Sequence, residues 1–370
     1  MTPLILHQCH AALGASFVDI RGMEGVNTYG NPLAEYQRLK STTAVLDLSF
    51  RGRLCLLGSD RKKFLHGQIT NRVMELQEGQ GCYAALISAK GRMQSDLHVH
   101  CLADELLLDF EPGLTTQLME RLDKYIIAED VQVVNVQEPY GLISLQGPGA
   151  RTTLEKLSPS LRIPGATYES TRQLDPNWGE IYCVNLPRFG SAGFDLFAPA
   201  EALESLHARA RESAESTGGG LAGWNAMETV RIEASIPRYG ADMDDTNLPP
   251  EAGLESRAIH YAKGCYIGQE VMARLRTYGQ VAKALRGLRL APDAKVLPQK
   301  GDRIVWGDKE IGHVTSATAS PTLRTNVVLA YLRRERFKPG DTVTIRTPNQ
   351  EIPAEVATLP FEAFRPGPCP

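Results

Sequence analysis

The stretch Lys263-Gly264-Cys265-Tyr266-Ile267-Gly268-Gln269-Glu270 decides how this sequence is interpreted. Two glycines flank a cysteine and a tyrosine, and a segment without Gly or Pro follows. We expect a tight loop that delivers Cys265 to the start of a short helix beginning near Gly268. Unpaired N–H groups at a helix N-terminus, together with the charge of Lys263, lower the pKa of a thiol and favour the thiolate. The alternative is that Cys265 is a small apolar filler, as most free cysteines are.

This octet resembles the signature of the YgfZ-type folate-binding proteins, which support iron–sulfur enzymes. These proteins belong to the superfamily of the glycine-cleavage T-protein, an aminomethyltransferase. Three other motifs extend the resemblance from about residue 45 to Phe361: Val45-Leu46-Asp47-Leu48-Ser49, Gln146-Gly147-Pro148 and Ile311-Gly312-His313-Val314-Thr315-Ser316. The resemblance implies an α+β fold, with a two-lobed folate-binding body of antiparallel sheets and helices over residues 1–283. It implies a C-terminal antiparallel β-barrel over residues 284–370, and tetrahydrofolate or a one-carbon derivative as cofactor.

Composition places the chain among ordinary globular proteins. Its 370 residues are enough for two or three domains, and its hydrophobic content is 42%. Its net charge of −3 gives no overall electrostatic attraction to nucleic acid or to a membrane surface. No apolar run approaches the ~20 residues that cross a bilayer, and no signal peptide is evident. We therefore expect a cytoplasmic monomer.

The number and spacing of the cysteines also favour the cytoplasm. The seven cysteines are an odd number and widely spaced: residues 9, 55, 82, 101, 183, 265 and 369. That pattern favours reduced thiols. Without a Cys-x-x-Cys pair or a His-rich cluster, we expect no zinc or iron–sulfur cage made by this chain alone.

Hydrophobic patterning predicts antiparallel hairpins crossed by helices. We expect a loop around Gly22 to Pro32, a surface loop over 158–177 and a helical stripe over 114–127. Residues 235–262 form a long irregular segment, which in a compact protein is more often functional than filler. From Ala284 onward, short strands separated by Gly or Pro turns predict a small antiparallel barrel or sandwich.

Asp96 is the first candidate catalytic residue. It ends the stretch Gly91-Arg92-Met93-Gln94-Ser95-Asp96, where T-proteins carry two aspartates and the second lies beside the folate ring nitrogens. The resemblance implies that Asp96 orients or accepts a proton at such a nitrogen. The alternative is an exposed strand aspartate, the usual state of this residue. Cys265 is the second candidate catalytic residue.

Four residues are candidates for cofactor binding. Asp195 lies where T-proteins usually have a glutamate that accepts hydrogen bonds from the pterin, although Asp is one methylene shorter. Arg231 matches a T-protein arginine suited to pairing with the glutamate tail of folate, or it is an ordinary surface residue. Glu111 stands where T-proteins tend to have an asparagine facing the pterin. Lys263 completes the set.

Local charge is uneven near the octet. Between Lys263 and Arg289 the chain carries six basic residues and one acidic residue, Glu270. The stretch is either a solvated helix face or a patch for a polyanion, such as polyglutamylated folate or RNA. No RNA-binding module accompanies it, so RNA is the weaker option.

Three functions remain open. The first is a tetrahydrofolate-binding accessory factor for iron–sulfur cluster assembly or repair, with Cys265 as a transient thiolate and iron–sulfur proteins as partners. The second is a glycine-cleavage aminomethyltransferase, which the presence of Asp96 favours. The third is a folate-binding or thiol-sensing module without catalysis. The octet leads us to expect the first.

Overall fold

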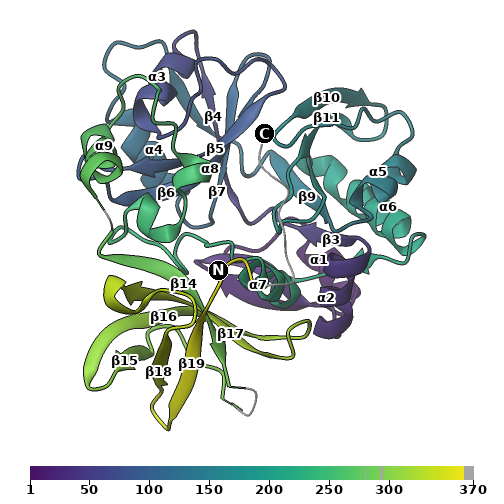
Figure 1. Cartoon of the computed structure of the whole chain (residues 1–370). Coiled ribbons are helices and arrows are strands. Elements are labelled where there is room, and N and C mark those ends of the chain that lie inside the picture. The colour runs from purple at the N-terminus through teal and green to yellow at the C-terminus, as the bar shows by residue number, and fades with distance from the viewer. Residues whose placement is uncertain (280, 292–293, 295, 362–370) are drawn as a thin grey trace. The chain divides into compact units, whose positions relative to one another are not determined.

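The computed structural model describes residues 1–279, 281–291, 294 and 296–361 (Figure 1). The chain divides into two compact units. The first unit comprises residues 1–84 and 96–227, and the second comprises residues 85–95 and 228–370. The domain boundary between residues 283 and 284 stays a prediction. Cys369 lies outside the described residues.

A five-stranded antiparallel sheet runs in the order β5-β6-β7-β4-β8. Its strands are β4 (Gly52–Leu57), β5 (Gly81–Ile87), β6 (Met93–Cys101), β7 (Leu106–Phe110) and β8 (Gln132–Asn135). Two helices accompany it, α3 (Arg61–Gln68) and α4 (Thr115–Asp123). The helix expected over 114–127 therefore ends at Asp123, because turns that include Tyr125 and Ile126 follow it. Buried leucines of α4, Leu118 and Leu122, supply its apolar side.

A six-stranded sheet in the same unit runs in the order β10-β11-β12-β9-β3-β13. Its strands are β3 (Ala44–Asp47), β9 (Tyr140–Gln146), β10 (Ser170–Asp175), β11 (Gly179–Asn185), β12 (Gly193–Pro199) and β13 (Gly220–Leu221). Figure 1 shows α5 (Ala150–Leu157) and α6 (Leu203–Glu215) side by side over this sheet. They cover its apolar face, where Ile143, Leu145 and Leu196 join one core. Because strand residues alternate between faces, Ser144, Gln146 and Asp195 lie on the opposite face.

Two of the expected loops were wrong. Residues around Gly22 to Pro32 contain strand β2 (Met23–Thr28), which pairs with β1 (Ser16–Ile20). The segment 158–177 contains β10, an edge strand paired with β11. In both cases the residues are polar and typical of turns, so the sequence pattern does not indicate a strand. The strand forms because its backbone pairs with a neighbouring strand. The flanking helices are α1 (His7–Ala12) and α2 (Pro32–Ser41).

The C-terminal strands close into a barrel, as expected, in the order β14-β17-β16-β15-β18-β19. They are β14 (Lys283–Leu290), β15 (Arg303–Trp306), β16 (Lys309–Ser320), β17 (Thr325–Arg333), β18 (Thr342–Arg346) and β19 (Glu351–Ala357). Alternate residues point inward, including Ile304, Val328 and Ile345, and fill the interior. The 3-10 turn η3 (Arg334–Arg336) follows β17.

The segment from 224 to 279 carries short helices and long turns. Helix α7 spans Trp224–Glu233, η2 spans Pro249–Ala252, α8 spans Glu255–Ala258 and α9 spans Gln269–Tyr278. The last begins where the octet predicts a helix. No helix among the described residues is both long and apolar enough to cross a membrane.

Candidate functional site

Polar side chains gather on one face of the five-stranded sheet. On β6, Asp96 and His98 share a face because they are two residues apart. Asp109 of β7 stands directly opposite His98 in the ladder, and Arg53 of β4 stands opposite Asp109. Asp109 is fully buried. A buried sheet face of this polarity is costly to form unless its charges are paired.

The charges are paired in a ladder of alternating sign. Arg51 donates from Nη1 to Oε1 of Glu111 at 2.8 Å and from Nε to Oδ1 of Asp109 at 2.7 Å. Arg188 donates from Nη2 to Oδ2 of Asp109 at 2.6 Å and to Oδ2 of Asp195 at 2.6 Å. The order is therefore Glu111, Arg51, Asp109, Arg188, Asp195, which we call the charge ladder. It links the five-stranded sheet to the six-stranded sheet.

The six-stranded sheet holds the Asp195 end of the ladder. Asp195 lies opposite Ser144 in the β12–β9 ladder, and the Ser144 hydroxyl donates to Oδ1 of Asp195 at 2.7 Å. Gln146 donates to Ser144 Oγ at 2.9 Å and accepts from the backbone N–H of Arg188 at 3.1 Å. Gly193 leaves room for this amide, since a Cβ there would lie 2.1 Å from Gln146 Oε1. Burial raises the pKa of Asp195, although Arg188 and Ser144 oppose that shift.

Asp96 is a half-buried carboxyl group on the same sheet face as Asp109. The hydroxyl of Tyr83 donates to its Oδ2 at 2.8 Å. Burial and the charge of Glu111 raise the pKa of Asp96 to about 6, while Tyr83 and Arg51 oppose the shift. A carboxyl group with a pKa near neutrality can both hold and release a proton under ordinary conditions.

Aromatic rings line the neighbourhood of Asp96. The ring of His98 lies 5.1 Å from that of Tyr83 and 5.9 Å from that of Tyr168, centroid to centroid. Burial, with the charge of Arg188, lowers the pKa of His98 well below its ordinary value, so this ring is neutral at pH 7. The site thus combines flat apolar faces with buried hydrogen-bonding groups, which is the pattern of a small-molecule site.

Arg231, Lys263 and Cys265 lie in the second unit, whereas Asp96, Glu111 and Asp195 lie in the first. The Arg231 guanidinium donates to Asp242, to Glu228 at 2.8 Å and to Ser316 Oγ at 2.7 Å. Burial alone would lower its pKa, but Asp242 and Glu228 reverse this and raise it. Arg231 is therefore buried in its own unit and is not the surface residue of the alternative interpretation.

The octet forms the expected loop before α9. Gly268 has φ +83°, and a Cβ there would lie 2.6 Å from the carbonyl oxygen of Ser88, so only glycine fits. The Cys265 side chain is exposed, which excludes the apolar-filler alternative. Lys263 is buried, with Nζ 4.8 Å from the ring centroid of Tyr266. That cation–π contact holds its charge against the tyrosine ring.

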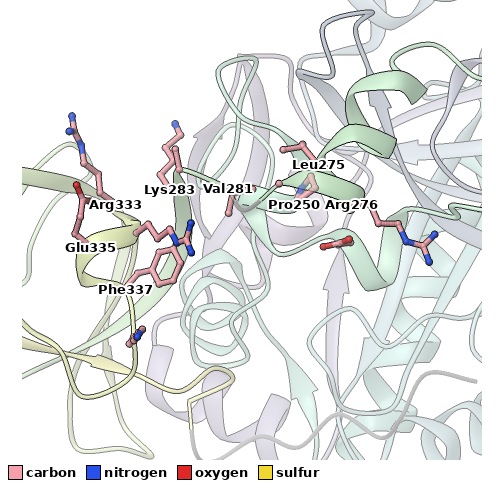
Figure 2. Close-up of a pocket in the computed structure, with 13 residues that line it drawn as sticks. Pro250, Leu275, Arg276, Val281, Lys283, Arg333, Glu335 and Phe337 are labelled. Carbon is pink, nitrogen blue, oxygen red and sulfur yellow. The ribbon is translucent and has the colours of Figure 1, made fainter.

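A cavity of about 1450 Å³ opens in the second unit (Figure 2). Five basic and two acidic side chains line it: Arg276, Lys283, Arg333, Arg334, Lys338, Glu255 and Glu335. Figure 2 shows Arg333, Glu335 and Phe337 on one side and Leu275, Pro250 and Arg276 on the other. The basic stretch expected between Lys263 and Arg289 is not one patch. Lys263 is buried and Arg286 stacks on Phe337, with Cζ 4.3 Å from the ring centroid.

Sequence reasoning missed Arg51, Asp109 and Arg188, three members of the charge ladder. Arg51 follows an ordinary turn and Arg188 lies in another, at positions where arginine normally faces solvent. Asp109 had one usable signal, since a lone acid within the apolar run Leu106-Leu107-Leu108-Asp109-Phe110 must be paired if that run is buried. The described residues contain no group of three or more His, Cys, Asp or Glu side chains placed to hold a metal ion.

Comparison with known proteins identifies the family. The family profile described as "GCVT N-terminal domain" matches residues 6–263, and "Glycine cleavage T-protein C-terminal barrel domain" matches residues 283–362. The chain belongs to the glycine cleavage T-protein family. The T-protein superfamily expected from the sequence is thus confirmed, while the YgfZ-type branch is not indicated. This family binds tetrahydrofolate and its one-carbon derivatives, the cofactor that the resemblance implied.

Aminomethyltransferases from other organisms match almost the whole of this chain. An aminomethyltransferase of Rubrobacter xylanophilus is 31% identical over 96% of this chain and 93% of its own. One of Halothermothrix orenii is 28% identical over 97% of this chain and 99% of its own. The structure of glycine cleavage system aminomethyltransferase T from Bartonella henselae has a TM-score of 0.88 over 98% of this chain and 99% of that chain, at 21% identity. This last likeness confirms the fold.

The donor set of the candidate site fits a reduced pterin. Asp195 and Arg188 offer a carboxylate acceptor and guanidinium donors, and Tyr83, His98 and Tyr168 offer flat rings. A pterin needs both, because its ring is planar and its edge carries hydrogen-bond donors and an oxo acceptor. Arg188 already occupies Oδ2 of Asp195, so the carboxylate does not face a ligand alone.

Proposed function

We propose that this chain is a folate-dependent aminomethyltransferase. It takes the carbon of an aminomethyl group carried on a lipoyl sulfur of a carrier protein and forms methylene-tetrahydrofolate. The nitrogen leaves as ammonia and the sulfur leaves as a free thiol. The reduced folate supplies the two nitrogens that take up the one-carbon unit, one in the pterin ring and one in the linker beside it. The relatives of matching length are aminomethyltransferases, which favours this function over the iron–sulfur accessory role expected from the octet.

The observation that carries the proposal is the environment of Asp96. Its carboxyl group is held by the Tyr83 hydroxyl at 2.8 Å, and burial raises its pKa to about 6. The ionised form accepts a proton and the neutral form returns it, and a pKa near the working pH keeps both forms available. Asp96 is therefore the group that moves or holds a proton at a ring nitrogen.

The other predicted residues act as holding groups. Asp195 accepts hydrogen bonds from the pterin edge, and Glu111, at the other end of the charge ladder, remains a candidate for contact with the pterin. Arg231 remains our candidate for the glutamate tail. It exchanges its more exposed partner Glu228, whose side chain is 21% exposed, for the incoming carboxylate. Lys263 is the weaker candidate, because its ammonium group lies over the Tyr266 ring.

The decisive experiment measures tetrahydrofolate-dependent ammonia release from an aminomethylated carrier protein. We expect turnover by the wild type and a loss of about 10²- to 10⁴-fold in Asp96→Asn, the usual contribution of a general acid–base group. Asp104→Asn is the matched control, because Asp104 is an exposed loop residue. A wild type without turnover contradicts the proposal.

One observation supports a second function, the iron–sulfur accessory role. The Cys265 thiol is exposed at a loop fixed by Gly268, as a transient thiolate requires. The test deletes the gene and assays iron–sulfur enzymes under oxidative stress. Full complementation by Cys265→Ala argues against a role for the thiol. Tight tetrahydrofolate binding with no effect in either assay favours a binding module without catalysis.

A further inference from the structure

The side chain of Arg188 is buried, but only two of its three guanidinium nitrogens donate hydrogen bonds to residues that the structure describes. Its Nε and Nη2 both donate to Oδ2 of Asp195, at 2.9 and 2.6 Å, and Nη2 also donates to Oδ2 of Asp109 at 2.6 Å. Its third nitrogen, Nη1, forms no hydrogen bond with any residue that the structure describes. The side chain is only 6% exposed. Nη1 is not one of the fully enclosed side-chain nitrogens without a partner, so a ligand can reach it and accept its hydrogen bond.

Asp195, which Arg188 contacts through Nε and Nη2, has an acceptor site of its own. An ionised carboxylate has about four lone-pair sites. Oδ2 receives two hydrogen bonds from Arg188, whereas Oδ1 receives one from Ser144 at 2.7 Å. One acceptor site on Oδ1 is left. The Arg188–Asp195 pair therefore keeps one unused donor and one unused acceptor site.

The charges of the ladder select a neutral ligand. Arg51 and Arg188 already face the carboxylates of Glu111, Asp109 and Asp195, with Asp96 on the same sheet face. A further anion would add a buried negative charge without a partner, which is costly. An uncharged oxygen acceptor adds none. The 4-oxo group of a pterin is such an acceptor, and the N3–H donor stands beside it on the ring.

We propose that Arg188 is a specificity-determining residue of the folate site: its Nη1 donates to the 4-oxo oxygen of a reduced pterin, and Oδ1 of Asp195 accepts from the same ring edge. This inference rests on the proposed use of tetrahydrofolate. A hydrogen bond from Arg188 makes the site selective against 4-amino pteridines, because their amino group at position 4 is itself a donor and cannot accept from Nη1. The guanidinium charge also opposes a protonated diamino ring.

The test compares the binding of tetrahydrofolate and its 4-amino analogue by titration calorimetry. We expect the wild type to prefer the 4-oxo compound by about tenfold to hundredfold, the effect of one hydrogen bond to a charged donor. Arg188→Lys keeps the positive charge between Asp109 and Asp195 but loses the planar fork. Its preference falls to within about threefold, while Arg172→Lys, an exposed arginine of β10, keeps the wild-type ratio.

A second variant, Arg51→Lys, tests whether Arg51 rather than Arg188 contacts the 4-oxo group. Arg51 shares Asp109 with Arg188 and also has one nitrogen, Nη2, without a hydrogen bond to the described residues. Loss of the preference in Arg51→Lys alone overturns the inference in favour of Arg51. Equal binding of both compounds by the wild type overturns it even if no variant folds. Binding with unaltered preference in Arg188→Lys overturns it but leaves the proposed function intact, whereas no binding of tetrahydrofolate overturns both.

Discussion

Arg188, in the turn between β11 and β12, donates to Asp109 of β7 across a distance of 2.6 Å, and this ion pair joins the six-stranded sheet to the five-stranded sheet. Asp109 holds Arg51 with its other oxygen. Arg188 and Arg51 together hold the pKa of Asp109 well below its ordinary value, although burial alone would raise it. One carboxylate thus bridges two guanidinium groups, each of which has a second carboxylate partner.

Removing the charge of Asp109 should destabilise the protein strongly. We expect Asp109→Asn to lower the free energy of unfolding by about 3–5 kcal/mol, because it leaves buried arginines without their common partner. Urea unfolding followed by circular dichroism measures the change. The control is Glu180→Gln, which breaks the exposed pair with Arg172 and should cost less than about 1 kcal/mol. Similar costs for both variants contradict the ladder.

Activity should depend on pH through Asp96. If its carboxylate accepts a proton, kcat/KM for ammonia release rises as pH rises through about 6, where the pKa of Asp96 lies. Glu111 helps to raise that pKa, so Glu111→Gln should move the rising limb to lower pH. A limb that stays in place shows that Glu111 does not act on the titrating group.

Stability should change in the opposite direction over the same range. The pKa of Asp96 is raised from 3.8 to about 6 on folding, so the folded chain keeps its proton longer than the unfolded chain. Its contribution is present below pH 3.8 and is lost as pH rises through about 6, by about 3 kcal/mol in total. Comparison of Asp96→Asn with the wild type by chemical denaturation at pH 4 and pH 7 isolates this term. Asn does not titrate, so the difference between the two proteins must vary with pH.

Folate binding should depend on the Asp195 carboxylate. We expect Asp195→Ala to weaken tetrahydrofolate binding by tenfold or more, about 1.4 kcal/mol, because a hydrogen bond to a charged group is lost. A titration of wild type and variant measures it. Asp175→Ala is the control from the end of β10. Unaltered affinity in Asp195→Ala places the pterin elsewhere.

The octet should be sensitive at Gly268 and tolerant at Cys265. Gly268→Ala combines φ +83° with a Cβ 2.6 Å from the Ser88 oxygen, so we expect a loss of about 2 kcal/mol or more in unfolding free energy. Gly67→Ala in α3 is the matched control, since its Cβ meets open space and Ala favours helix. Cys265→Ala, at an exposed position, should leave stability within about 0.5 kcal/mol.

Much of the fold could be predicted because period-two patterning and turn residues act locally. The barrel strands from residue 284 onward and α9 lie where the sequence places them. Strands β1, β2 and β10 were missed because their residues alternate weakly and their stability comes from pairing with neighbours. Asp96 and Asp195 could be singled out only through motif resemblance, not through charge or spacing.

The sequence by itself determined the T-protein family, the α+β class, the closing barrel and the loop that exposes Cys265. Local patterns and glycine positions carry that information, because backbone conformation depends on near neighbours. Only the tertiary structure decided which charges meet. Arg51, Asp109 and Arg188 come from three separate stretches, and their pairing follows from two sheets burying their polar faces, where no charge can be left without a partner.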